Sequence, residues 1–144
     1  MKLFFICMGN YYRSRLAEEL LSYYASSNNL QIEVDSGGLA LNSRNLGAIA
    51  PAALKYLEKL NIIPKNANRN PKNCTVEDLK SSDYIICMQE EEQRELFEAS
   101  FPYLKSRVVY WHVPDKTDDD TLELLHSQVQ HLISSYSRFN NIYQ

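Results

Sequence analysis

The sequence predicts an α/β fold of three layers, in which a parallel sheet is covered by helices on both faces. Two observations predict it. Short apolar runs of strand type alternate along the chain with longer segments of helical periodicity, a pattern typical of parallel sheets buried between helices. The chain has 144 residues, of which 44% are hydrophobic, and this is enough for one domain with a single core. We therefore expect residues 1–144 to form one domain.

The first half of the chain predicts two strands and two helices. Residues 3–6 are a short apolar run of the kind found in buried strands. Residues 14–26 carry apolar side chains about every four residues, which is typical of an amphipathic helix. Residues 31–35 alternate and predict a strand that ends at the Ser-Gly-Gly of 36–38. Apolar spacing over residues 49–60 predicts the second helix.

The second half repeats this alternation. Thr75–Asp78 matches a weak capping signal for a short helix. Residues 84–88 and 108–113 are apolar and predict two more strands. Glu90–Glu92 begin a helix, because acidic side chains are favourable at the positive end of a helix dipole. Residues 122–136 carry an apolar stripe and predict the last helix.

Four polar or sulfur-bearing residues lie at or just after the ends of the predicted strands: Cys7, Ser36, Met88 and Asp115. In a parallel sheet, ligands bind beyond the carboxyl ends of the strands. We therefore expect these four residues to meet at one edge of the sheet, although they come from distant parts of the chain.

Composition excludes several classes of protein. A net charge of -3 gives no general attraction to nucleic acid or to anionic membranes. The apolar run Leu3–Met8 is far too short to span a membrane or to serve as a secretory signal. Cys7, Cys74 and Cys87 include no CxxC pair, so neither a disulfide framework nor a zinc site is suggested. We expect a cytoplasmic protein that binds neither nucleic acid nor membranes and uses no metal.

A thiol and an arginine lie at the junction between the first strand and the first helix, in Cys7–Ser14, "CMGNYYRS". A loop at this position turns backbone N–H groups inward and forms a nest for a tetrahedral oxyanion. Gly9 and Asn10 tolerate the left-handed conformations that such a loop needs. Arg13 offers two parallel N–H donors to phosphate oxygens, and a thiolate at Cys7 is the matching nucleophile.

Four motifs together resemble the low-molecular-weight protein tyrosine phosphatase family, whose signature is C-x-G-N-x-x-R-S. Residues 7–14 match that signature at every fixed position, and "VDSGG" at 34–38 resembles the family's VDSAG segment. Residues 76–96 resemble the stretch containing D-Y-I-x-C-M-D, and "WHVPDK" at 111–116 lies where members carry the acid loop. The resemblance implies a four-stranded parallel sheet with a phosphate-binding loop after the first strand, and catalysis without a cofactor.

The resemblance also implies a role for each site residue. Cys7 would be the nucleophile, Arg13 the phosphate clamp, and Asp115 the general acid and then the general base. Ser14 would hydrogen-bond the sulfur and help it leave. The loop residues that would surround the phosphate are Met8, Gly9, Asn10, Tyr11, Tyr12 and Ser14, and the loop would be supported by Asn10, Ser14 and Ser36.

The sequence departs from the family pattern at four positions. Tyr12 stands where many members have a second cysteine, and Tyr11 stands where better-known members have an aliphatic residue or threonine. Lys116 follows the acid-loop aspartate in place of proline, and Gln89 replaces the aspartate of the M-D pair. The first three departures surround the substrate, so the sequence predicts phosphatase chemistry more firmly than it predicts the substrate.

The leading hypothesis is a phosphatase that acts on phosphotyrosine in proteins, releases inorganic phosphate, and is a monomer or a weak dimer. One alternative is an arsenate reductase-like thiol enzyme, but Cys74 and Cys87 are not spaced for the disulfide exchange that such an enzyme needs. A second is a phosphatase for phosphoarginine or a small molecule. A third is a regulator that binds phosphate without catalysis, which would not need Asp115.

Overall fold

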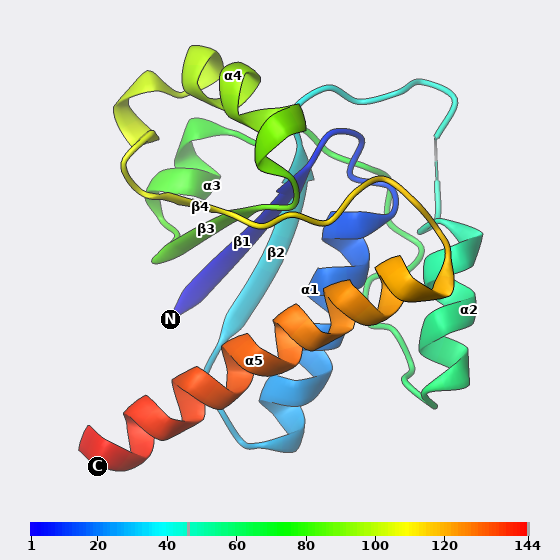
Figure 1. The fold of residues 1–144 in the computed structure, drawn as a ribbon, viewed down its shortest axis with the longest axis vertical. Coiled ribbons are helices and arrows are strands. Elements are labelled where there is room, and N and C mark those ends of the chain that lie inside the picture. Colours follow the sequence, from blue (N-terminus) through cyan, green and yellow to red (C-terminus); the bar gives the residue numbers. More distant parts are fainter. Residues whose placement is uncertain (46, 144) are drawn as a thin grey trace.

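The central layer is a sheet of four parallel strands in the order β2-β1-β3-β4 (Figure 1). The computed structural model describes residues 1–45 and 47–143, with side chains described as far as residue 136. The strands are β1 (Lys2–Cys7), β2 (Glu33–Gly38), β3 (Tyr84–Cys87) and β4 (Val108–Tyr110). The predicted parallel sheet is confirmed, and its central strands β1 and β3 correspond to the apolar runs at residues 3–6 and 84–88.

Helices cover both faces of this sheet (Figure 1). One face packs against α1 (Arg13–Ser27), α2 (Pro51–Lys59) and α5 (Asp119–Tyr143). The other packs against α3 (Val76–Lys80), α4 (Glu90–Ser100) and the short 3-10 helix η1 (Pro102–Leu104). In the described part of the chain, no helix combines the length and the apolarity that a membrane crossing requires.

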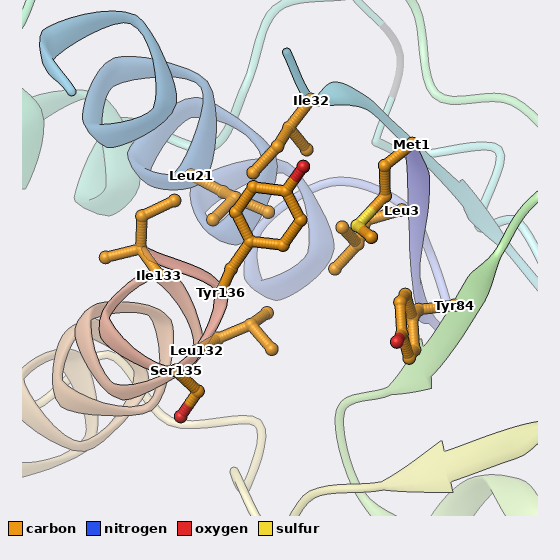
Figure 2. A pocket seen from close by; sticks show the side chains of 9 residues that line it. All are labelled: Met1, Leu3, Leu21, Ile32, Tyr84, Leu132, Ile133, Ser135 and Tyr136. Atoms are coloured by element: carbon orange, nitrogen blue, oxygen red, sulfur yellow. The ribbon is translucent and has the colours of Figure 1, made fainter. Parts of the chain in front are cut away.

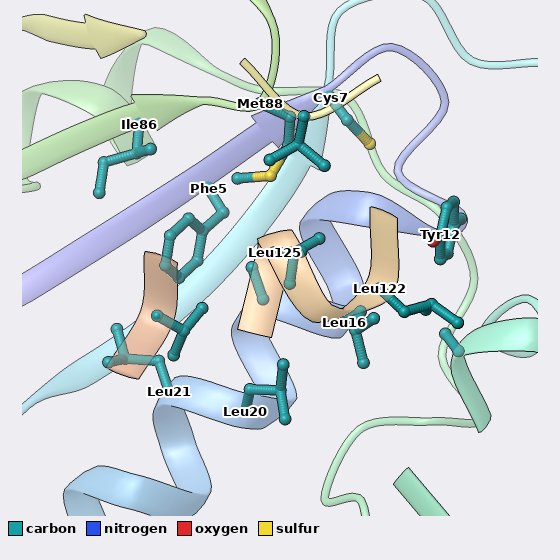
Figure 3. Close-up of a cluster of buried hydrophobic side chains, with 14 of the residues drawn as sticks. Phe5, Cys7, Tyr12, Leu16, Leu20, Leu21, Ile86, Met88, Leu122 and Leu125 are labelled. Carbon is teal, nitrogen blue, oxygen red and sulfur yellow. The ribbon is translucent and has the colours of Figure 1, made fainter. Parts of the chain in front are cut away.

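The alternation of β1 side chains divides the core into two clusters. Leu3, Phe5 and Cys7 point to the face covered by α1 and α5 (Figure 3), and Phe4 and Ile6 point to the face covered by α4. The phenylalanines and Ile6 are fully buried. The strand therefore delivers the Cys7 thiol to the face from which α1 starts.

β2 ends within the Ser-Gly-Gly of 36–38, where the sequence predicts its end. Ser36, Gly37 and Gly38 pair with the last residues of β1. The two glycines serve close packing: a Cβ at Gly38 would lie 2.6 Å from the carbonyl oxygen of Met8, and one at Gly37 would lie 3.0 Å from the Cys74 sulfur. The strand thus brings Ser36 beside the loop that follows β1.

β4 is shorter than predicted, because the chain leaves the sheet after Tyr110. Residues 111–113 continue with other bonds: the Val113 N–H donates to the Met88 carbonyl oxygen at 2.8 Å, and Gln89 and His112 form an isolated bridge. Trp111 and Val113 are buried in the core. This tether places the segment that contains Asp115 next to the start of α4.

Candidate active site

One residue of the loop between β1 and α1, Asn10, has a left-handed backbone conformation. Asn10 has φ 48°, a conformation that asparagine tolerates better than most residues. Gly9, which we also expected to need this conformation, has no positive φ. The side chain of Asn10 is fully buried and anchors the loop from behind.

The Cys7 sulfur lies at a small cavity of about 120 Å³. Its lining residues are Cys7, Met8, Gly9, Tyr11, Tyr12, Arg13, Asn45 and Asp115. The nucleophile, the arginine and the acid that the sequence predicts therefore surround one space, together with four of the predicted loop residues. Asn45 was missed, because it comes from a polar loop that shares no motif with the rest.

A chain of hydrogen bonds links the sulfur to the sheet. Cys7 Sγ and Ser14 Oγ are 2.9 Å apart, and Asn10 Nδ2 donates to both Ser14 Oγ and Ser36 Oγ, each at 2.9 Å. Because Asn10 already supplies a donor to Ser14, the Ser14 hydroxyl hydrogen is free to point at the sulfur. This arrangement stabilises negative charge on Cys7.

Two charged residues that the sequence analysis missed complete this network. Arg69 donates to Asn10 Oδ1 at 2.9 Å, to Ser36 Oγ at 2.7 Å and to Glu18 Oε1 at 3.0 Å. Ser36 Oγ in turn donates to Glu18 Oε1 at 2.6 Å. The buried Glu18 carboxylate and Arg69 thus satisfy the polar groups behind the loop, which would otherwise be costly to bury.

Arg15 and Glu19 attach the connection between α2 and α3 to α1. Arg15 is 2% exposed and donates to the carbonyl oxygens of Asn66 and Ala67 at 2.9 and 3.1 Å. Burial lowers the pKa of Arg15, and the charge of Arg69 lowers it further. Glu19 accepts from the backbone N–H groups of Lys65 and Asn66 at 2.8 and 2.9 Å. These bonds hold Arg69 in reach of the loop.

The Arg13 guanidinium is buried, at 3% exposure, and some of its N–H groups donate hydrogen bonds to other atoms of the protein. Nη1 donates to the Val113 carbonyl oxygen at 3.0 Å and to Gln89 Oε1 at 3.3 Å, while Nη2 donates to Glu92 Oε1 at 2.7 Å. A guanidinium has five N–H donors, so the Nε–H and one Nη2–H stay available on one edge. Two parallel N–H groups of this kind have the geometry to bind two oxygens of a phosphate group.

Asp115 lies at the mouth of the cavity, with its side chain 68% exposed and its Oδ1 3.8 Å from Arg13 Nε. Asp118 directly precedes α5 and accepts from the Thr121 hydroxyl at 2.6 Å. That hydrogen bond lowers the pKa of Asp118. Of these two aspartates, only Asp115 lines the cavity.

Tyr12 is an unusual wall for this cavity. The side chain is buried, at 6% exposure, and its hydroxyl has no hydrogen-bond partner among the described residues. Burial raises the pKa of Tyr12 to about 12, and the nearby charge of Asp115 adds to the shift. Its ring packs at the start of α1 (Figure 3), where it narrows the site while the phenol keeps its proton.

The other two cysteines pack on the opposite face of the sheet from Cys7. Cys87 is buried in the core on the α4 face, and Cys74 packs against that same cluster. Burial raises the pKa of both thiols. Among the residues the structure describes, no group of three His, Cys, Asp or Glu side chains is arranged to hold a metal ion.

A larger cavity of about 310 Å³ lies at the opposite end of the sheet, beside the starts of β1 and β3 (Figure 2). Leu3, Leu21, Ile32, Leu132 and Ile133 make most of its wall. The described residues that line it include no cysteine, histidine or acidic side chain. The smaller cavity, which Cys7, Arg13 and Asp115 line, is therefore the candidate active site.

Comparisons with known proteins agree on a family. The model of the low molecular weight phosphotyrosine protein phosphatase family matches residues 2–136. No curated protein matches the chain.

Among solved structures, a low molecular weight protein tyrosine phosphatase from Streptococcus pyogenes is similar, with 26% identity and a TM-score of 0.77 over 93% of this chain and 91% of that one. A low molecular weight phosphotyrosine phosphatase from Vibrio cholerae has 21% identity and a TM-score of 0.83 over 95% and 97% of the two chains. The YwlE arginine phosphatase from Geobacillus stearothermophilus has 18% identity and a TM-score of 0.73 over 99% and 94%.

The family model covers the phosphate-binding loop, the acid-loop segment and most of the last helix. The loop, the buried arginine and the aspartate at the cavity occupy the places that the sequence motifs predict. This chain belongs to the low molecular weight phosphotyrosine protein phosphatase family.

Proposed function

We propose that the protein hydrolyses phosphotyrosine in proteins through a phosphocysteine intermediate. The observation that carries this proposal is the placement of Cys7 Sγ, 2.9 Å from Ser14 Oγ, in a cavity that Arg13 and Asp115 also line. A nucleophile, a bidentate oxyanion donor and a proton donor in one space are what transfer of a phosphoryl group requires.

In the first step the Cys7 thiolate attacks phosphorus, the S–P bond forms and the P–O bond to the tyrosine breaks. The backbone N–H groups of the loop and the free edge of Arg13 bind the phosphoryl oxygens, whose charge they stabilise. Asp115, in its protonated form, gives its proton to the leaving phenolic oxygen.

In the second step water attacks phosphorus and the S–P bond breaks, which regenerates the Cys7 thiolate and releases inorganic phosphate. Asp115, now a carboxylate, accepts the proton from the water. The Ser14 hydroxyl donates to the sulfur as it leaves and lowers the cost of its negative charge. Neither step needs a cofactor.

Phosphoarginine is the second candidate substrate, and the polar wall of the cavity favours it. Asn45 and Asp115 line the mouth and offer oxygen acceptors to the N–H groups of a guanidinium. The Geobacillus stearothermophilus neighbour is an arginine phosphatase. Against this, Tyr11 offers an aromatic wall on which a phosphotyrosine ring can pack.

A panel of matched peptides decides between these substrates. Each peptide carries phosphotyrosine, phosphoserine or phosphoarginine in one sequence, and released phosphate is measured for the wild type and for Cys7→Ser. We expect the wild type, but not Cys7→Ser, to release phosphate from the phosphotyrosine peptide. Faster turnover of the phosphoarginine peptide would mean that the substrate is phosphoarginine and not phosphotyrosine. Reduction of arsenate without phosphatase activity would overturn the proposed function.

A further inference from the structure

Glu92 makes the shortest contact of the Arg13 guanidinium. Its Oε1 lies 2.7 Å from Arg13 Nη2, and its side chain is 30% exposed whereas that of Arg13 is 3% exposed. Glu92 belongs to the first turn of α4, far in sequence from the phosphate-binding loop. Nothing in the motifs that carry the family resemblance assigns it a role.

The carboxylate of Glu92 is itself held in place. Gln93 is fully buried and its Nε2 donates to the same Glu92 Oε1 at 3.1 Å. The Oε1 of Gln93 accepts from the backbone N–H of Gln89 at 3.2 Å, so this buried amide is fixed at both ends. Glu92 therefore presents one oriented oxygen to Arg13, which a freely rotating surface glutamate would not do.

Arg13 needs a fixed counter-charge, and its other neighbours do not supply one. A guanidinium this deeply buried is costly unless it is paired and hydrogen-bonded. Gln89 is neutral and lies further away, at 3.3 Å. Asp115 is charged, but its oxygen is 3.8 Å from Nε and the side chain must gain and lose a proton during the proposed reaction.

We propose that Glu92 is the residue that positions Arg13, a role for which the neutral Gln89 is unsuited. By holding one Nη2–H, the carboxylate fixes the rotation of the guanidinium so that the Nε–H and the second Nη2–H face the cavity. This assignment rests on the proposed function for its effect on turnover, but its effect on binding of phosphate does not depend on catalysis.

If Glu92 positions Arg13, its removal changes the affinity for phosphate in the opposite direction from the one that its charge alone predicts. Glu92 places a negative charge beside an anion site, so charge alone predicts that its removal tightens the binding of phosphate. A misdirected guanidinium predicts that its removal weakens binding, because the bidentate fork is lost. The sign of the change therefore separates the two accounts.

The test compares Glu92→Ala with Glu91→Ala, a matched control that removes the same charge from an exposed neighbour in the same turn. Inorganic phosphate is titrated into each protein by calorimetry, and kcat and KM are measured with an aryl phosphate. We expect Glu92→Ala to lose affinity for phosphate and kcat/KM by about 10- to 100-fold, the worth of a charged hydrogen bond. Glu91→Ala should change either value less than about 2-fold.

Adding Gln89→Glu to Glu92→Ala moves the carboxylate to the other acceptor of Arg13 and should recover most of the loss. Rescue of this kind is not expected from a merely structural role, and thermal denaturation checks that each variant is folded. Unchanged or tighter binding of phosphate by folded Glu92→Ala would overturn the assignment. A wild type that binds phosphate but turns over no phosphate ester would instead refute the proposed function. In that case the phosphate affinities of the wild type, Glu92→Ala and Glu91→Ala would still test the role of Glu92.

Discussion

Arg13 is the side chain on which the contacts of the site converge. Its buried guanidinium joins α1 to the start of α4 and to residues 111–113, through Glu92 and Val113. The edge that is left over faces the cavity beside Cys7 and Asp115. Arg13 thus links the loop to residues 111–113 and to α4, and under the proposed function its free edge is also the oxyanion donor.

The side chain of Asp115 differs from the other residues of the site in its exposure to solvent. Cys7, Arg13 and Ser14 are buried and fixed by hydrogen bonds, whereas the side chain of Asp115 is 68% exposed. An exposed carboxylate can reach both a leaving oxygen and an incoming water, which suits a group that first donates and then accepts a proton.

Asp115→Ala should slow substrates with poor leaving groups far more than activated ones. General acid catalysis contributes about 10²- to 10⁴-fold, and an oxygen that leaves readily needs little of it. The measurement is kcat/KM for a series of aryl phosphates that differ in the pKa of the phenol. Asp118→Ala, which removes the partner of Thr121, is the control and should affect the series evenly. Equal losses along the series for Asp115→Ala would mean that this aspartate has a structural role.

At the scale of elements, His126 joins three helices on one face of the sheet. Its Nε2 lies 2.6 Å from the Tyr24 hydroxyl of α1, and its Nδ1 lies 2.7 Å from the Tyr56 hydroxyl of α2. The sequence alone gave this histidine no role. A neutral imidazole donates through one nitrogen and accepts through the other, so it can satisfy both phenols at once.

This junction predicts a dependence of stability on pH. Burial lowers the pKa of His126 below its ordinary value of 6.5, so the unfolded chain takes up a proton more readily than the folded one. The contribution of His126 is fully present above pH 6.5 and is lost as the pH falls from there toward the lower pKa of the folded state. The free energy of unfolding, measured from about pH 8 to about pH 5, should therefore fall less in His126→Gln than in the wild type. His131→Gln changes an exposed histidine of the same helix and should follow the wild type; identical curves for all three proteins would contradict the prediction.

The apolar runs were sufficient to predict the elements but not all of their ends. β1 and β3 are buried on both faces and read as continuous apolar segments, so their positions were evident. The end of β2 at 36–38 was predicted from the two glycines, but the sequence did not show that Gly37 and Gly38 permit close packing there. The early end of β4 was missed because Trp111 and Val113 stay buried after the chain has left the sheet.

The site was predictable where a local motif carries the chemistry and not where distant residues meet. Cys7 and Arg13 lie within one loop, so their spacing was informative. Glu18 and Arg69 contact each other over 51 positions of sequence, and Arg13 and Glu92 over 79. Polar side chains that pair across such separations leave no periodic signal, and each alone resembles an ordinary surface charge.

In the whole molecule, the sheet separates the Cys7 thiol from the thiols of Cys74 and Cys87. Cys7 points to the face covered by α1 and α5, whereas Cys87 is buried on the face covered by α4 and Cys74 packs there too. A disulfide requires the two Cβ atoms to approach within about 4.5 Å, which the placement of Cys7 and Cys87 on opposite faces of the sheet opposes. The position that many family members fill with a second cysteine is occupied by Tyr12.

Oxidation of Cys7 should therefore be poorly reversible. Peroxide converts a reactive thiolate to sulfenic acid, and without a nearby thiol to trap it the sulfur proceeds to sulfinic acid. The experiment treats the enzyme with peroxide, adds dithiothreitol, and measures recovered activity and sulfinic acid at Cys7 by mass spectrometry. We expect low recovery in the wild type and a larger recoverable fraction in Tyr12→Cys. Full recovery of the wild type, with a Cys7–Cys87 disulfide in the digest, would show that the sheet is no barrier.

Catalysis through a phosphoryl group on Cys7 can be tested by trapping that group. Asp115→Ala should accumulate the intermediate with an activated aryl phosphate, because attack does not need the acid while hydrolysis still needs the base. The mixture is quenched with acid during turnover and digested, and the peptide containing Cys7 is analysed by mass spectrometry. We expect one added phosphoryl group on Cys7 that is absent from Cys7→Ser and from samples without substrate. Sustained turnover with an unmodified Cys7, or a phosphoryl group on another residue, would contradict it.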